Sequence, residues 1–147
     1  MQQHFKASLV RPTLPRFAFV KDLQSTEGLP KKETAQYSNE NGLRFIYSYF
    51  GIFGDPLIDT IHDPYPDGLL ARLAAKGVNG IWMHVVLHQL SPGGNDFPEF
   101  GEGHLTRLQN LRRIVERAKQ YGIAVYLYMN EPRAMPLSFF KNRQEMM

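Results

Sequence analysis

The stretch GLLARLAAKGVNGIWMHVVLHQLSP, residues 68–92, contains the change from helix to strand that decides the fold. Its first half has apolar residues at helical spacing, namely Leu69, Leu70, Leu73 and Ala74. Gly77 follows, at the kind of position where a glycine commonly ends a helix. Residues 78–90 are then almost continuously apolar, as parallel strands are when both of their faces are covered. The stretch therefore predicts a helix, a short turn and a buried parallel strand.

The same order recurs toward the C-terminus. A helix is predicted from residue 104, and its expected apolar stripe consists of Leu105, Leu108, Leu111, Val115 and Ala118. Gly122 is expected to end it, and IAVYLYMN, residues 123–130, reads as a further buried strand. The basic residues of this helix are expected to form a solvated face in preference to a phosphate-binding patch; they include Arg107, Arg113, Arg117 and Lys119.

Upstream, LRFIYSYFGIFG at residues 43–54 is rich in aromatic and β-branched residues and ends in glycine, which predicts the first strand. Long loops follow the first two strands, at residues 55–68 and 91–103, whereas the turns before strands two and three are short. Alternating strands and helices favour a parallel sheet with right-handed crossovers. SFFKNRQEMM at residues 138–147 predicts the start of another helix, with Ser138 at its cap position.

The bulk composition is typical of a soluble globular domain. The 147 residues suffice for about one domain, and 43% are hydrophobic and 21% charged. The formal net charge of +3 is spread along the chain, without the dense basic patch of a nucleic-acid binder. The absence of cysteine excludes disulfides, thiolate metal sites and a cysteine nucleophile. Neither a secretory signal nor an apolar run of roughly 20 residues is visible, and the compartment stays undetermined.

Two stretches carry a resemblance to a known family. The first, GLLARLAAKGVNGIWMHVVLHQLSP, is followed by HLTRLQNLRRIVERAKQYGIAVYLYMNEP at residues 104–132. Together they resemble the opening of a (β/α)8-barrel glycoside hydrolase, in which a helix, K-G-V-N, strand unit precedes a helix, A-K-x-Y-G-I-x-V, strand unit. The resemblance implies an α/β fold over residues 43–147, a partial TIM barrel of about three βα units with parallel strands. Residues 1–42 are expected to form an irregular N-terminal arm, in which RFAFV at residues 16–20 allows a short strand.

A full barrel of this type needs on the order of 250 residues. The chain is therefore expected to be either a fragment of a longer protein or a truncated product that self-associates through the open barrel edge. On that expectation it is a hydrolase only when the missing strands are supplied.

Side chains alternate along a strand, so parity assigns the two faces of each predicted strand. In the second strand, the face expected to meet the helices consists of Ile81, Met83, Val85 and Leu87. The side chains expected to point into the barrel are Trp82, His84, Val86 and His88, together with Tyr126, Tyr128, Asn130, Tyr47 and Tyr49. Such an interior favours a polar ligand, and a sugar fits best. The alternative is that these polar atoms bond to one another inside the core.

Ligands of parallel α/β proteins bind beyond the carboxyl ends of the strands. YLYMNEPRAMP, residues 126–136, brings polar residues to that end of the third strand. In one large clan of retaining glycosidases an Asn-Glu pair ends the fourth strand and the glutamate is the acid/base. The resemblance thus assigns catalysis to Glu131, although the pair here follows the third predicted strand. The predicted substrate-binding residues are His88, Asn130, Arg133, Tyr128, His84 and Asp55.

The neighbouring charges leave the role of Glu131 open. Arg133 is expected to lower the pKa of Glu131 and so favour sugar binding over acid catalysis, and a surface ion pair is the plain alternative. Glycosidases need two carboxylates about 5–10 Å apart. Candidates for the second one are Asp55, Asp59 and Asp63, whereas Asp96, Glu99 and Glu102 are expected in a rim or lid.

The sequence favours a carbohydrate-active protein that acts on glycosidic bonds by carboxylate acid/base chemistry. A non-catalytic sugar-binding or assembly module is one alternative, and a barrel enzyme of other chemistry, such as an isomerase or aldolase, is another. No cofactor or metal is expected, because His84 and His88 would lie roughly 13 Å apart on one strand. The expected partner is a carbohydrate substrate, with neither nucleic acid nor membrane.

Overall fold

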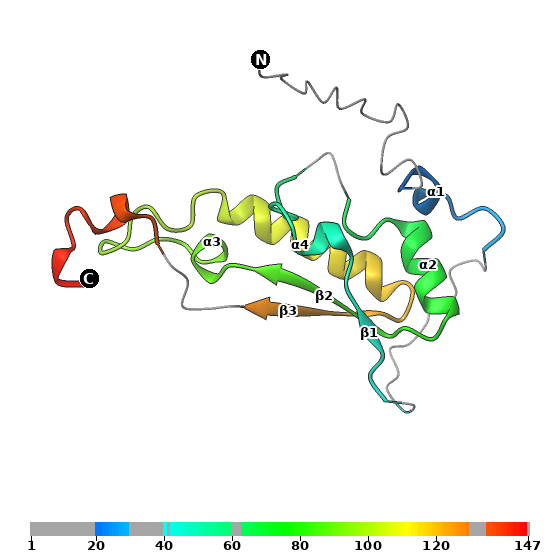
Figure 1. The fold of residues 1–147 in the computed structure, drawn as a ribbon. Helices are drawn as coiled ribbons and strands as arrows, with labels where there is room; N and C mark the ends of the chain where they lie inside the picture. Colours follow the sequence, from blue (N-terminus) through cyan, green and yellow to red (C-terminus); the bar gives the residue numbers. More distant parts are fainter. Residues whose placement is uncertain (1–19, 30–39, 41, 60–62, 130–134, 147) are drawn as a thin grey trace, which may run out of the picture.

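The fold is a three-stranded parallel sheet with helices packed on one face (Figure 1). The computed structural model describes residues 20–29, 40, 42–59, 63–129 and 135–146. The strands are β1 (Phe45–Ile46), β2 (Gly80–Val85) and β3 (Ala124–Met129), in the order β1-β2-β3. Both pairs of neighbouring strands are parallel, which confirms the predicted α/β class and strand direction.

Helices connect the strands as the sequence predicts. The α-helices are α1 (Val20–Gln24), α2 (Asp67–Ala75), α3 (Leu87–Leu90) and α4 (His104–Lys119). Three 3-10 helices complete the described elements: η1 (Tyr49–Gly51), η2 (Leu137–Phe140) and η3 (Gln144–Met146). The connection from β1 to β2 contains α2, and the connection from β2 to β3 contains α4, so the chain runs β-α-β-α-β through the sheet.

Several element boundaries differ from the predicted ones. The first strand is shorter than residues 43–54 because the chain turns at Ser48, whose carbonyl accepts the Gly51 N–H at 2.9 Å within η1. In the arm, Val20 begins α1 and belongs to no strand, while residues 16–19 lie outside the described part. Ser138 lies inside η2, so the predicted α-helix at the C-terminal end is wrong there.

Two glycines end the long helices as predicted. Gly77 has φ +74°, and its N–H donates to the Ala74 carbonyl at 2.8 Å while the next N–H donates to the Leu73 carbonyl at 3.0 Å. Gly122 has φ +68°, and the same pattern of two backbone hydrogen bonds surrounds it after α4. Both turns have the helix-ending geometry that needs a left-handed residue. The two strands start level, with Gly80 of β2 paired to Ala124 of β3.

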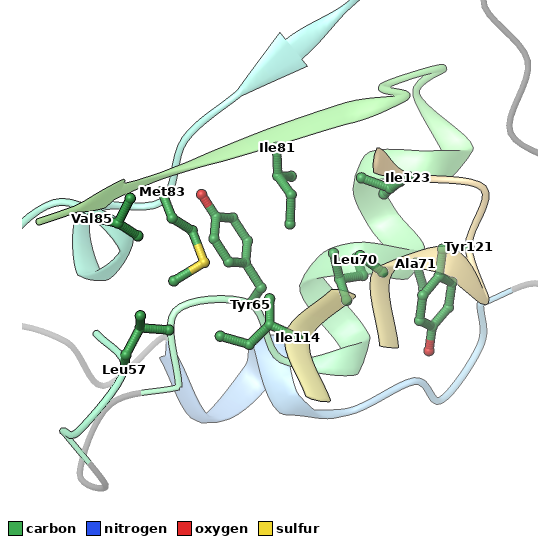
Figure 2. Close-up of a cluster of buried hydrophobic side chains, with 11 residues drawn as sticks. Leu57, Tyr65, Leu70, Ala71, Ile81, Met83, Val85, Ile114, Tyr121 and Ile123 are labelled. Carbon is green, nitrogen blue, oxygen red and sulfur yellow. The ribbon is translucent and has the colours of Figure 1, made fainter. Parts of the chain in front are cut away.

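The hydrophobic core lies between the sheet and the helices (Figure 2). From β2, Ile81, Met83 and Val85 point toward α2 and α4, and they are 0%, 0% and 3% exposed. The core also contains Leu57, Tyr65, Leu70, Ala71, Ile114, Ala118, Tyr121 and Ile123. The parity prediction is thereby confirmed for these three residues of β2, since the face assigned to the helices is the buried one.

Of the stripe predicted for α4, only Leu111 and Ala118 pack against the core. The buried residues of the helix are Arg107, Ile114 and Ala118, and Leu111 packs against the same core. Leu105, Leu108 and Val115 are exposed, so they were wrongly placed in the buried stripe. The helix carries leucines on more than one side, and the side that faces the core is the one whose arginines find partners in the loop before α2.

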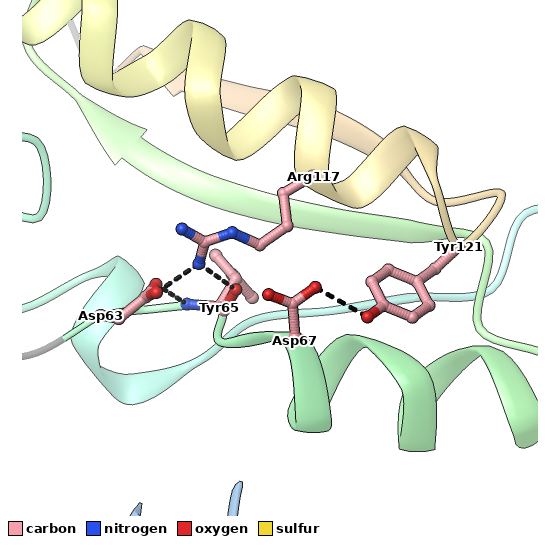
Figure 3. A network of polar contacts seen from close by, with 5 residues as sticks. All are labelled: Asp63, Tyr65, Asp67, Arg117 and Tyr121. Atoms are coloured by element: carbon pink, nitrogen blue, oxygen red, sulfur yellow. Dashed lines mark hydrogen bonds and ion pairs between the residues drawn. The ribbon is translucent and has the colours of Figure 1, made fainter. Parts of the chain in front are cut away.

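The expected solvated face is wrong for Arg107 and Arg117, whereas Arg113 and Lys119 are exposed as predicted. Arg117 forms an ion pair with Asp63 and donates a hydrogen bond to the Tyr65 carbonyl at 3.0 Å (Figure 3). One turn further, the Tyr121 hydroxyl donates to Asp67 at 2.7 Å, and burial together with this carboxylate raises the pKa of Tyr121. The entrance to α2 is therefore fixed to α4 by polar contacts as well as by the core.

Candidate functional site

The sheet face opposite the helices is lined by aromatic side chains. The register pairs Phe45 with Gly80, Trp82 with Tyr126, and His84 with Tyr128, so all six residues lie on one face. The helices α2 and α4 lie against the other face (Figure 1). Phe45 and Tyr128 are 55% and 51% exposed, as expected for a face that no described helix covers.

Three of these residues, together with Tyr47 just after β1, form a continuous row of rings over β2 and β3. Tyr47 meets Trp82 edge to face with ring centroids 5.0 Å apart, and Trp82 meets Tyr128 in the same way at 5.3 Å. His84 lies beside Tyr128 at 5.9 Å. We call Tyr47, Trp82, Tyr128 and His84 the aromatic row. The predicted common face for these residues is confirmed, whereas Tyr49 belongs to η1 and contacts Phe50 and Phe53.

A small polar cavity lies at the carboxyl end of β2, where the aromatic row ends. This inner cavity has a volume of about 130 Å³. Its polar side chains are Asp55, His84, Gln89 and Arg107. Two predicted substrate-binding residues, Asp55 and His84, are thus brought together, although they come from different strand exits.

Arg107 is the residue of this site that the sequence analysis missed. It is 9% exposed, and its Nη2 donates to the Asp55 carboxylate at 2.7 Å while Nη1 donates to the Glu102 carbonyl. Its Nε is buried and has no hydrogen-bond partner among the described residues. A signal was available, because Arg107 stands seven residues before Ile114 and so shares its helix face. Because Arg107 pairs with it, Asp55 is held in an ion pair and is not a free carboxylate.

A larger outer cavity of about 440 Å³ adjoins the inner one, and both are lined by Gln89 and Arg107. Its other lining residues are Ile58, His88, Glu99, Gly101, Glu102 and Gly103. His88 was predicted on the strand, but β2 ends at Val85 and His88 lies in α3. Strand parity therefore does not apply to His88, whose ring packs against Phe100 at 5.0 Å. The two histidines line different cavities.

The remaining predicted residues divide into two groups. Asn130, Glu131 and Arg133 lie outside the described residues. The preceding residue, Met129, pairs with Val85, so β3 ends at the same end of the sheet as β2. Asp63 is engaged by Arg117 and lines neither polar cavity, which separates it from the candidate site.

Comparisons with known proteins give no family, since the chain matches no protein-family model, no curated protein and no solved structure. Within the described ranges, no group of three or more His, Asp or Glu side chains is placed to hold a metal ion. No helix of that same part is both long and apolar enough to cross a membrane. The site places aromatic rings beside imidazole, amide and carboxylate groups, and this combination suits binding of a polyhydroxylated ligand.

Proposed function

We propose that this chain forms part of a (β/α)8 barrel of the glycoside hydrolase type and that the sheet face opposite α2 and α4 lines the barrel interior and binds carbohydrate. The observation that carries the proposal is the course of the aromatic row, which runs from Tyr47, just after β1, over β2 and β3 and ends at a polar cavity beyond β2. Sugars present C–H surfaces that pack on aromatic rings and hydroxyls that need hydrogen-bonding groups. The aromatic row supplies the rings for the C–H surfaces, and the cavities supply the hydrogen-bonding groups for the hydroxyls.

Catalysis, in this proposal, belongs to Glu131, with Asn130 and Arg133 beside the substrate. Tyr128 is the last residue of the aromatic row along β3, and Asn130 and Glu131 follow it by two and three positions. A glutamate so placed is suited to protonate a leaving group at the strand exit or to accept hydrogen bonds from sugar hydroxyls.

Hydrolysis would need a second carboxylate beside Glu131, and two candidates for it are already engaged. Asp55 is paired with Arg107 at 2.7 Å, and Glu99 is paired with Arg143 at 2.7 Å. In each pair the guanidinium hydrogen-bonds to carboxylate oxygen that a nucleophile or general base would need to be free, which disfavours that role. We therefore expect this chain to bind sugar with little or no turnover, and the rest of the barrel to supply the partner of Glu131. The same two ion pairs favour the second candidate function, a non-catalytic sugar-binding module.

Trp82 gives a direct test, because it is the only tryptophan of the chain and lies inside the aromatic row. Its emission is measured while the protein is titrated with gluco-, galacto-, xylo- and N-acetylglucosamine oligosaccharides. We expect a saturable change with at least one series, and Tyr128→Ala should weaken that binding about fivefold or more. Leu105→Ala, on the exposed side of α4, is the control. No saturable response to any series would overturn the proposal.

Turnover separates the two candidates. Aryl glycosides are incubated with the chain, and with a longer barrel if one is identified, in wild-type and Glu131→Gln form. Hydrolysis that Glu131→Gln abolishes supports the hydrolase, whereas binding that persists unchanged without hydrolysis in the longer barrel supports the binding module.

A further inference from the structure

The loop after β2 and the segment after β3 are joined by stacked rings. Phe97 and Phe100 lie in the loop, with centroids 5.1 Å apart and ring planes 13° from parallel. Phe139, in η2, stacks on Phe97 at 6.0 Å and on Phe100 at 5.9 Å. Offset parallel rings at these distances are a favourable aromatic arrangement. Figure 1 shows both segments beyond the arrowheads of β2 and β3, at the end of the sheet where the cavities lie.

Arg143 secures this stack from the C-terminal side. Its guanidinium lies 4.5 Å from the ring centroid of Phe139 and 5.2 Å from that of Phe97. Nη1 and Nη2 donate to the two carboxylate oxygens of Glu99 at 2.7 and 3.2 Å, and Nη2 also donates to the Asp96 carbonyl at 2.8 Å. A planar guanidinium that binds both oxygens of a carboxylate fixes its orientation as well as its charge.

The loop itself is closed at its base by glycines. A Cβ on Gly93 would lie 2.4 Å from the Phe100 carbonyl oxygen, and one on Gly101 would lie 2.4 Å from the Ser91 carbonyl oxygen. The Gly101 N–H also donates to the His88 carbonyl at 2.8 Å. The backbone at the two ends of the loop is thus in direct contact.

The residues held by this arrangement also line the outer cavity. Glu99 and Gly101 form part of its wall, and so does His88, whose ring contacts Phe100. We propose that Arg143 is a positioning residue: by clasping Glu99 and the rings of Phe97 and Phe139 it fixes the loop wall of the outer cavity, and it thereby sets the affinity of that cavity for sugar. The role in sugar affinity rests on the proposed function, whereas the positioning of the loop does not.

A charge exchange tests the clasp. Backbone hydrogen–deuterium exchange of residues 91–103 is compared in the wild type, Arg143→Glu, Glu99→Arg and the double variant. We expect Arg143→Glu to speed exchange about tenfold, and the double variant to recover about threefold of it by restoring the ion pair. Arg113→Glu is the charge-matched control, since the partner of Arg113 among the described residues is Asn110, on its own helix at 3.3 Å. Exchange that Arg143→Glu leaves unchanged would overturn the clasp.

The same variants are then titrated with the oligosaccharide that gives the strongest Trp82 response. We expect Arg143→Glu to weaken binding about fivefold, with partial recovery in the double variant. Faster loop exchange with unchanged affinity would overturn the role in sugar binding and leave the clasp and the proposed function standing. A wild type that binds no sugar would overturn the proposed function, and with it the role of Arg143 in affinity, while the exchange data would still decide the clasp.

Discussion

The hydroxyl of Tyr65 donates a hydrogen bond to the backbone carbonyl of Trp82, with 2.5 Å between the two oxygens. The same hydroxyl accepts the Ser48 N–H at 3.1 Å. Tyr65 is fully buried just before α2, so one phenol ties the central strand to the chain that leaves β1. The contact reaches Trp82 from the helix side of the sheet, through its backbone, while the indole lies in the aromatic row.

Tyr65→Phe is expected to lower the free energy of unfolding by about 1–3 kcal/mol, because the ring still packs but a buried carbonyl and an N–H lose their partner. Urea unfolding followed by Trp82 fluorescence measures this. Tyr47→Phe is the matched control, since Tyr47 is 52% exposed, and its effect should stay within about 0.5 kcal/mol. Equal effects of the two changes would contradict the structural role given to the Tyr65 hydroxyl.

The same phenol makes the free energy of unfolding depend on pH in the alkaline range. Burial raises the pKa of Tyr65 from 10.0 to about 12. The folded state therefore binds the proton more tightly than the unfolded state, and this contribution is complete below about pH 10 and is lost as pH rises through about 12. We expect the free energy of unfolding to fall over that window, and to fall less steeply in Tyr65→Phe. Tyr121, whose pKa is also raised, accounts for part of the remaining slope. Identical slopes in the two proteins would exclude Tyr65 as a source.

The parts of the fold that could be predicted from the sequence are those fixed by local chemistry. Alternation along β2 identifies Ile81 and Met83 as buried, and the left-handed turn at Gly77 follows from a glycine between a helical and an apolar pattern. The inner face of α4 was not predictable in the same way. The spacing to Ile114 places Arg107 on the inner side of the helix, but an arginine is buried there only because Asp55, 52 residues away in sequence, lies opposite it, and the local sequence does not show that contact.

The candidate site shows the same division. Trp82, His84 and Tyr128 share a face because they lie on regular strands, where parity holds. Parity failed for His88 because the strand stops at Val85 and the chain turns into α3. The clasp between Arg143 and Glu99 joins residues 44 positions apart, in two segments that the sequence marks only as a loop and a helix start.

The two faces of α4 differ in their expected response to truncation. Ile114 is 6% exposed in the core, so Ile114→Ala should lower the free energy of unfolding by about 2–4 kcal/mol. Leu108 is 42% exposed, and Leu108→Ala should cost well under about 1 kcal/mol. Urea unfolding of both variants measures the difference. A larger loss for Leu108→Ala would mean that the apolar stripe predicted from the sequence, and not the observed face, is turned toward the core.

Gly77 and Gly94 form a pair that separates backbone strain from side-chain volume. Gly77→Ala should cost about 1–2 kcal/mol, because its φ of +74° is unfavourable for a residue with a Cβ. The added Cβ would also lie 3.0 Å from the end of the Arg44 side chain, which can move. Gly94 has open space around it and no positive φ, so Gly94→Ala should be neutral or slightly stabilising. Thermal unfolding checks both, and equal shifts in Tm would argue against a left-handed turn at Gly77.

Arg107 is expected to act as the polar anchor between the two strand-exit loops. Arg107→Met keeps much of the side-chain volume but leaves the Asp55 carboxylate and the Glu102 carbonyl without their donor. Loss of one member of a buried pair costs about 3–5 kcal/mol, and because the Asp55 side chain is 36% exposed we expect about 2–3 kcal/mol here. Asp55→Asn combined with Arg107→Met removes the uncompensated charge, so the double variant should be more stable than Arg107→Met alone. Urea unfolding of the two single variants and the double variant gives the coupling energy, and additive effects would show that the ion pair does not join these loops.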